Sequence, residues 1–238
     1  MNVVIQVYKV QRPNKQRNAP PDSRAKLLTC GRQIIERSGV RGLTVRGLAT
    51  RAKVNLGTFV YHFGTREAFV AEVLESWYAP IYARLQLTVD EDLPPLEKLR
   101  HFILRFAAFM IENRAFTRNV LLDLAGGEPA VKPFVLSLFG RHPQLLLRLI
   151  REAQGAGVLQ QAEPLKLALS LVGATLMPIL WAGILMPPGL VGPEARAAID
   201  SIVLSPAEIE QRFERAMSGL HSRPAARRKR TTHRQASS

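Results

Sequence analysis

The sequence predicts an all-α protein, with an N-terminal helix-turn-helix domain of three helices and a larger helical domain after it. Apolar residues recur at intervals of three and four along most of the chain, which is the period of an amphipathic helix. Residues 1–66 carry a net charge of +11 and residues 221–238 carry +6, whereas residues 67–220 carry −3. This distribution is typical of a module that binds a polyanion joined to a second domain that does not.

A first helix is expected between Asp22 and Gly39. Asp22 or Ser23 is placed to cap its start, and Gly39 supplies the left-handed conformation that a helix end favours. Cys30 is the only cysteine, so an internal disulfide is excluded, and we interpret it as a buried, inert thiol rather than a redox sensor. The apolar stripe of this helix comprises Leu27, Leu28, Cys30, Ile34 and Ile35.

Residues 43–69 predict a helix, a tight turn and a second short helix. The hydroxyl of Thr44 can accept a free backbone N–H at the start of the first of these helices. Asn55 is placed to cap the second, which is expected over residues 56–63, with Phe59 and Phe63 pointing inward. The residues that form one apolar face of the first helix are Val45, Leu48, Ala49 and Ala52.

The open face of the second helix carries amide, hydroxyl and ring groups, which suits the major groove of DNA. Arg46 and Arg66 lie near helix starts and are expected to contact phosphates, while Thr58, Tyr61 and His62 are expected to form the recognition surface. An alternative for Tyr61 is a ring packed against the first helix. The predicted DNA-binding residues are Thr44, Arg46, Asn55, Leu56, Gly57, Thr58, Tyr61, His62 and Arg66.

This stretch resembles the TetR/AcrR family of bacterial transcriptional repressors. The chain differs from the usual family pattern in Lys53, where a glycine is common, in Val60, where a tyrosine is common, and in Arg66, where a lysine is common. The resemblance implies a homodimer that binds a double-stranded DNA operator and responds to a small-molecule effector. The residues in register with the family are Thr44, Val45, Leu48, Ala49, Ala52, Val54, Gly57, Thr58, Phe63, Thr65, Glu67 and Phe69.

The chain is therefore expected to comprise four segments: a flexible basic arm (1–22), the DNA-binding domain (23–69), a ligand-binding and dimerisation domain (70–220) and a disordered basic tail (221–238). Helical periodicity continues through the third segment. The first helix expected there begins at Thr65 and ends near Thr88, and the second begins at Pro94-Pro95. Further helices are expected over residues 116–124, 131–139, 142–156 and 206–220.

Residues 167–191 contain no charged side chain and are long enough for a membrane span. Pro178 lies inside the segment and Pro187-Pro188 ends it, so we prefer a helix buried on all sides in a protein without membrane attachment. In the family that the chain resembles, the last two helices of each subunit form the dimer interface. Residues 167–191 and 206–220 are in the corresponding places.

The family resemblance also implies an effector pocket in the third segment. Candidate lining residues are Phe102, Phe106, Phe109, Met110, Met177 and Trp181. His101, Arg105 or Arg118 could orient an acid or a hydroxyl group in such a pocket. Ordinary core packing is the alternative interpretation of all of these side chains.

Enzyme motifs are absent from the sequence. There is no glycine-rich phosphate loop after a strand and no nucleophile elbow, and the five histidines show no metal-ligand spacing. We therefore expect no enzyme activity, no metal and no cofactor, and a cytoplasmic, ligand-responsive DNA-binding repressor. The alternatives are a non-specific architectural DNA-binding protein that uses the arm and the tail, and a regulator anchored in a membrane by residues 167–191.

Overall fold

The computed structural model describes residues 22–184, 186 and 189–221. Over these residues the chain forms twelve helices and no β-strand, which confirms the predicted all-α class. The predicted basic arm and basic tail lie outside the described residues, apart from Asp22 and His221. His221 pairs with Leu159 in an isolated β-bridge, so the predicted tail begins with a residue that contacts the helical domain.

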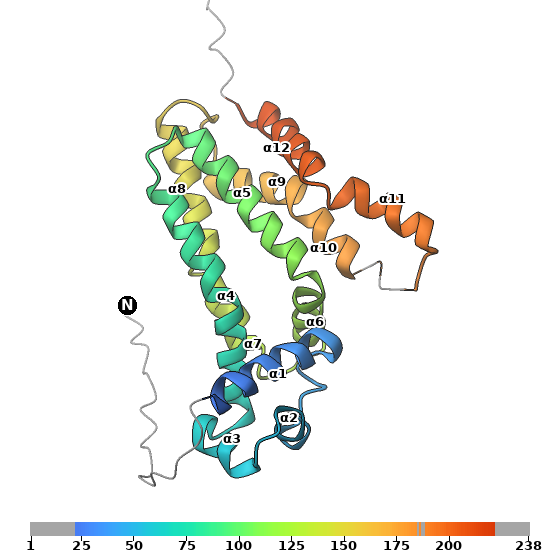
Figure 1. Ribbon diagram of the computed structural model, residues 1–238. Coiled ribbons are helices and arrows are strands. Elements are labelled where there is room, and N and C mark those ends of the chain that lie inside the picture. The colour runs from blue at the N-terminus through green and yellow to red at the C-terminus, as the bar shows by residue number, and fades with distance from the viewer. Residues whose placement is uncertain (1–21, 185, 187–188, 222–238) are drawn as a thin grey trace, which may run out of the picture.

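Three short helices form the DNA-binding domain at one end of the molecule (Figure 1). They pack around a core that includes Leu27, Leu48 and Phe59, each at most 1% exposed. Gly31 allows a close approach, because a Cβ at that position would lie 2.5 Å from the ring of Phe69. The three helices are α1 (Ser23–Ser38), α2 (Val45–Ala52) and α3 (Leu56–Phe63), close to the predicted bounds.

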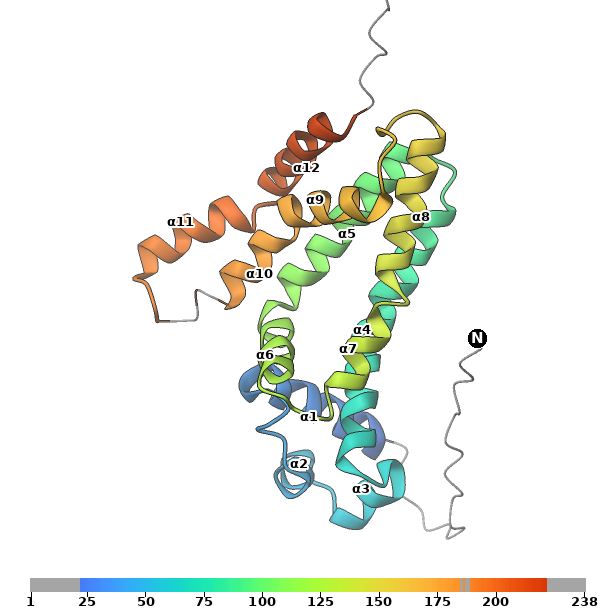
Figure 2. The ribbon, with the colours of Figure 1, turned by 180° about the vertical axis from the view of Figure 1, so that it is seen from behind.

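The long helix α4 (Arg66–Asp90) begins in the DNA-binding domain and continues into the second domain (Figures 1 and 2). Its apolar side chains, including Leu74, Tyr78 and Leu85, are buried among the helices packed along it. α6 lies against α1 and therefore joins the second domain to the DNA-binding domain. The helices of the second domain that pack along α4 are α5 (Pro95–Glu112), α7 (Lys132–Leu138) and α8 (His142–Gly155), whereas α6 (Arg114–Ala125) packs on α1, α5 and α10 (Met177–Ile184).

The sequence predicts one helix buried on all sides over the uncharged segment 167–191, and this prediction is wrong. The chain bends by 45° between Pro164–Thr175 and Met177–Gly183. Leu169 is 64% exposed and Trp181 is 58% exposed, so each half presents apolar side chains to the surface. The last four helices are α9 (Pro164–Thr175), α10 (Met177–Ile184), α11 (Pro193–Val203), which the sequence analysis did not predict, and α12 (Pro206–Leu220).

No single helix in the described part of the chain is both long and apolar enough to cross a membrane. Only the bent pair α9–α10 reaches the required length and composition, when its two halves are counted together.

Candidate DNA-binding surface

Side-chain caps define the starts of both helices of the helix-turn-helix. Thr44 Oγ1 accepts the backbone N–H of Gly47 at 3.2 Å, and Asn55 Oδ1 accepts the backbone N–H of Thr58 at 2.7 Å. Each bond satisfies an N–H group that has no partner within its helix. Both caps lie where the sequence analysis placed them.

The turn between α2 and α3 passes through a left-handed residue. Lys53 has φ 54° and ψ 43°, and it is the only residue other than glycine with a positive φ in the described part of the chain. Glycine adopts this conformation without steric cost, which accounts for the glycine that is common at this position in the family pattern. The backbone N–H of Val54 then donates to the carbonyl oxygen of Ala49 at 3.0 Å and closes the turn.

One side of α3 packs on the core and the other is exposed. Phe59 and Phe63 are buried, whereas Leu56 is 45%, Val60 55% and Tyr61 59% exposed. The Tyr61 ring therefore does not fill the core against the first helix. The exposed side is the one available to a ligand as large as DNA.

Thr58 and His62 are only half-buried on this helix. The Thr58 hydroxyl donates to Asn55 Oδ1 at 2.9 Å, so an acceptor on DNA would have to compete with that bond. His62 Nε2 is buried without a hydrogen-bond partner among the described residues. Burial and the nearby positive charge of Arg24 lower the pKa of the imidazole, so the ring is neutral near pH 7.

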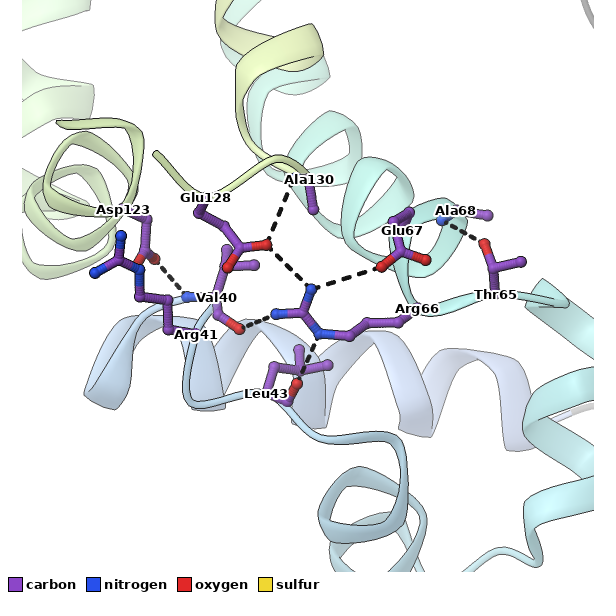
Figure 3. Close-up of polar contacts among 10 residues, drawn as sticks. All are labelled: Val40, Arg41, Leu43, Thr65, Arg66, Glu67, Ala68, Asp123, Glu128 and Ala130. Carbon is purple, nitrogen blue, oxygen red and sulfur yellow. Dashed lines mark hydrogen bonds and ion pairs between the residues drawn. The ribbon is translucent and has the colours of Figure 1, made fainter. Parts of the chain in front are cut away.

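Arg66 does not lie as expected. Its guanidinium is turned into the protein, where Nε donates to the Leu43 carbonyl at 2.9 Å and Nη2 to the Val40 carbonyl at 2.7 Å (Figure 3). Nη1 lies 3.1 Å from Glu128 Oε1. The loop carbonyls have no helical partners and the buried carboxylate requires a counter-charge, so this arrangement replaces the expected phosphate contact.

Other cations are free to meet phosphates. Arg37, Arg46 and Lys53 are exposed, and no carboxylate of the described residues lies within ion-pair distance of them. Arg46 is in the first turn of α2, beside the capping residue Thr44. Positive charge at a helix start with free N–H groups gives a surface that attracts phosphate.

Comparison with known proteins identifies this domain. Residues 27–73 match the family model of bacterial regulatory proteins of the tetR family. The N-terminal domain is a TetR-family DNA-binding domain. The chain is accordingly a DNA-binding transcriptional regulator of the helix-turn-helix type, and its matched relatives are regulators rather than enzymes.

Two curated proteins to which this chain is similar are transcriptional repressors. DhaR of Mycobacterium sp. (strain GP1) is 23% identical over 58% of this chain and 70% of its own length. KstR2 of Mycolicibacterium smegmatis is 33% identical over 40% of this chain, and the match spans 46% of that relative.

Solved structures show the same fold over most of this chain. The ketosteroid transcriptional regulator KstR2 of Mycobacterium tuberculosis superposes with a TM-score of 0.60 at 18% identity, covering 86% of this chain and 98% of that one. PfmR of Thermus thermophilus gives a TM-score of 0.56 at 21% identity, covering 74% of this chain and 96% of that one.

The six predicted pocket residues do not line one cavity. Met177 and Trp181 line an open apolar cavity of about 590 Å³ between α10 and α11, together with Met186, Ile199 and Val203. The four on α5 lie elsewhere in the core. Phe102 and Met110 are buried, the Phe106 ring centroid lies 4.6 Å from that of His142, and that of Phe109 lies 5.1 Å from Trp77. The sequence could not separate the two sets, because both are apolar and composition does not reveal which elements they face.

The sequence analysis also missed three polar residues that connect the two domains. Asn119, Asp123 and Glu128 are buried near the DNA-binding domain, and each bonds to it. Asn119 and Asp123 are four residues apart in α6, and their polar character on the face shared with Phe116 and Val120 is a signal that could have been noticed.

No group of three His, Cys, Asp or Glu side chains that could hold a metal ion occurs among residues 22–184, 186 and 189–221.

Proposed function

We propose that this protein is a ligand-responsive repressor that binds operator DNA as a homodimer and releases it when a small molecule binds the C-terminal domain. The main support is the DNA-binding surface: two capped helices, an exposed α3 face with Tyr61, and unpaired cations at Arg37, Arg46 and Lys53. The curated relatives are repressors as well.

A homodimer is supported by the incomplete packing of the C-terminal helices. α11 contains no buried residue in the isolated chain, although more than half of its residues are apolar or alanine. Large exposed apolar side chains gather on α9, α10 and α11, and a second copy of the chain would cover them and close the open side of the cavity. These residues are Leu165, Leu169, Met177, Trp181 and Ile202.

Release of DNA requires an effector that prefers one arrangement of the dimer. An effector with equal affinity for the DNA-bound and free arrangements would shift nothing. We place its site in the C-terminal domain and the protein in the cytoplasm, where a regulator has access to the chromosome.

Operator recognition can be tested by fluorescence anisotropy at fixed, near-physiological salt. The DNA is the protein's own upstream intergenic region, compared with a shuffled sequence of equal length. Strong preference for the upstream DNA, lost in Tyr61→Ala and Thr58→Ala, is the expected result. Phe139→Ala is the matched control, because it removes an aromatic ring that is 65% exposed just after α7, far from α3. Equal binding of both DNAs by the unmodified protein would contradict the proposal and support the architectural alternative.

A further inference from the structure

Two side chains of α6 hold the C-terminal end of α1. Asn119 Nδ2 donates to the carbonyl oxygens of Ile35 at 2.9 Å and Glu36 at 2.8 Å. Asp123 Oδ2 accepts the backbone N–H of Val40 at 2.5 Å. Asn119 is 8% and Asp123 6% exposed, so water does not compete for these bonds.

The contact requires a glycine at the end of α1. Gly39 has φ +73°, and a Cβ at this position would lie 2.6 Å from Asp123 Oδ2. The last carbonyl groups of any helix have no partner within the helix. Here Asn119 supplies that partner for the Glu36 carbonyl, while the Ile35 carbonyl also accepts the backbone N–H of Gly39 at 2.9 Å. The end of α1 is therefore completed only when α6 is in place.

We define the corner as residues 39–43, between α1 and α2. Further polar contacts hold the corner in addition to the bond between Asp123 and Val40. Arg41 donates to the Gly126 carbonyl, and Arg66 bonds the Val40 and Leu43 carbonyls while pairing with Glu128 (Figure 3). The helix-turn-helix begins at the next residue, Thr44. The corner therefore sets the position from which α2 and α3 start.

The opposite side of α6 contacts the helix proposed for the dimer interface. Thr117 and Arg118 on α6 and Leu180 and Gly183 on α10 line one small hollow between the two helices. Trp181, on the same helix α10, lines the large apolar cavity. α6 thus touches both the corner and the helix whose surroundings a partner subunit or an effector would change.

We propose that Asn119 and Asp123 are positioning residues, which fix the orientation of the helix-turn-helix relative to α6. A displacement of α6 is then transmitted to the corner and to recognition helix α3 through these two side chains. Neither residue contacts DNA in this arrangement. Their effect is on the placement of α3 and not on its chemistry.

Single-molecule FRET on the full-length chain tests this without DNA. Dyes are attached at Val60→Cys on α3 and Arg151→Cys on α8, in a Cys30→Ala background, with labelled subunits diluted in excess unlabelled protein. The original sequence should give one narrow transfer-efficiency peak. Asn119→Ala and Asp123→Ala should shift or broaden that peak at temperatures where circular dichroism shows full helicity.

The controls separate positioning from stability. Leu122→Ala removes a side chain that is 49% exposed on α6 and makes none of these bonds, so its peak should match the original. Asp123→Asn keeps an acceptor oxygen and should restore most of the narrow peak. Asn119→Leu removes the donors at nearly constant volume and replaces Asn119→Ala if the latter does not fold. An unchanged peak position and width in folded Asn119 and Asp123 variants would overturn the proposal.

A second measurement, which rests on the proposed function, uses operator spacing. One base pair inserted between the half-sites rotates one site by about 35° relative to the other. The unmodified protein should lose about tenfold in affinity. The Asn119 and Asp123 variants should lose about threefold or less, because the orientation of their DNA-binding domains is less constrained. Absence of any operator would refute the proposed function while leaving the FRET result intact; equal losses in all variants would contradict the positioning role alone.

Discussion

Arg66 and Glu128, 62 residues apart in the sequence, form an ion pair across the two domains, with Arg66 Nη1 3.1 Å from Glu128 Oε1. The Arg66 side chain is 24% and the Glu128 side chain 10% exposed. Glu128 Oε1 also accepts the backbone N–H of Ala130 at 3.4 Å. The pair therefore links the start of α4 to the loop after α6. Removal of either side chain would leave the other charge partly buried without its counter-charge, which lowers the stability of the fold.

Arg66→Met should destabilise the protein by about 3 kcal/mol, because it leaves the buried Glu128 carboxylate without a counter-charge and removes the hydrogen bonds to the Val40 and Leu43 carbonyls. Urea unfolding measures this free energy. The double variant Arg66→Met, Glu128→Gln should recover part of the loss, since no uncompensated charge remains. Arg24→Met is the matched control: its ion pair with Glu72 is half-exposed, so a loss below about 1 kcal/mol is expected. A similar loss in Arg24→Met would show that burial of the Arg66 pair is not the cause.

Arg46→Ala should weaken operator binding and make its dependence on salt less steep. Each phosphate contact contributes about 0.9 to the slope of log K against log salt, so the slope should fall by about one. Arg46 is exposed and forms no ion pair within the described residues, so the folded domain should keep its stability. Anisotropy titrations at several salt concentrations measure the slope.

Arg148→Ala on α8 removes the same charge from a side chain that is 63% exposed, far from α3. Its salt slope should equal that of the unmodified protein. An equal change in both variants would mean that net charge alone sets the attraction, and the assignment of Arg46 to a phosphate would then be wrong.

The sequence predicted the local features of the DNA-binding domain well and the contacts between distant elements poorly. Caps such as Thr44 and Asn55 depend on neighbours three residues away, so the residues themselves carry the signal. The placement of Arg66 depends on Glu128, which approaches it only in the folded chain. A basic residue at a helix start looks the same whether it meets DNA or a buried carboxylate.

The C-terminal helices illustrate a second limit. Hydropathy alone could not place the break at Leu176, because the residues on both sides are apolar and uncharged. α11 was missed although Ala195, Ala198, Ile199 and Ile202 recur at helical spacing, and none of its residues is buried in the isolated chain. The cavity lined by Met177 and Trp181 arises from the bend, which composition does not encode.

Acid should destabilise the protein through His142. Tyr78 Oη lies 2.7 Å from His142 Nδ1, and burial lowers the pKa of His142 to about 4. The unfolded chain, with an ordinary histidine pKa of about 6.5, binds the proton more readily between those values. Stability contributed by the neutral ring is therefore present above a pH of about 6.5 and is lost as the pH falls toward about 4, by about 2 kcal/mol between pH 7 and pH 5.

Urea unfolding at both pH values isolates this effect when His142→Asn is compared with the unmodified protein. The amide oxygen of asparagine can accept the Tyr78 hydroxyl and does not titrate. The variant should lose about 2 kcal/mol less than the unmodified protein over this range, since other groups titrate equally in both. Identical pH dependence of the two proteins would show that His142 is not the responsible group.

Leu169→Glu and Ile202→Glu should each dissociate the proposed dimer. The two side chains are 64% and 62% exposed in the isolated chain, so a charge there costs the folded subunit little. In a dimer the same carboxylates would be buried without a partner, which costs several kcal/mol per subunit. Sedimentation equilibrium should then give the monomer mass at concentrations where the unmodified protein is a dimer.

Leu87→Glu supplies the control, because Leu87 on α4 is 68% exposed and lies away from α9, α10 and α11. Its dimer should be intact. Circular dichroism checks that all three variants are folded. Because one half-site contact is much weaker than two linked ones, the two dissociated variants should also lose at least about a hundredfold in operator affinity. Dimers of unchanged stability in both Leu169→Glu and Ile202→Glu would place the interface on a different surface from the one that α9 and α11 expose.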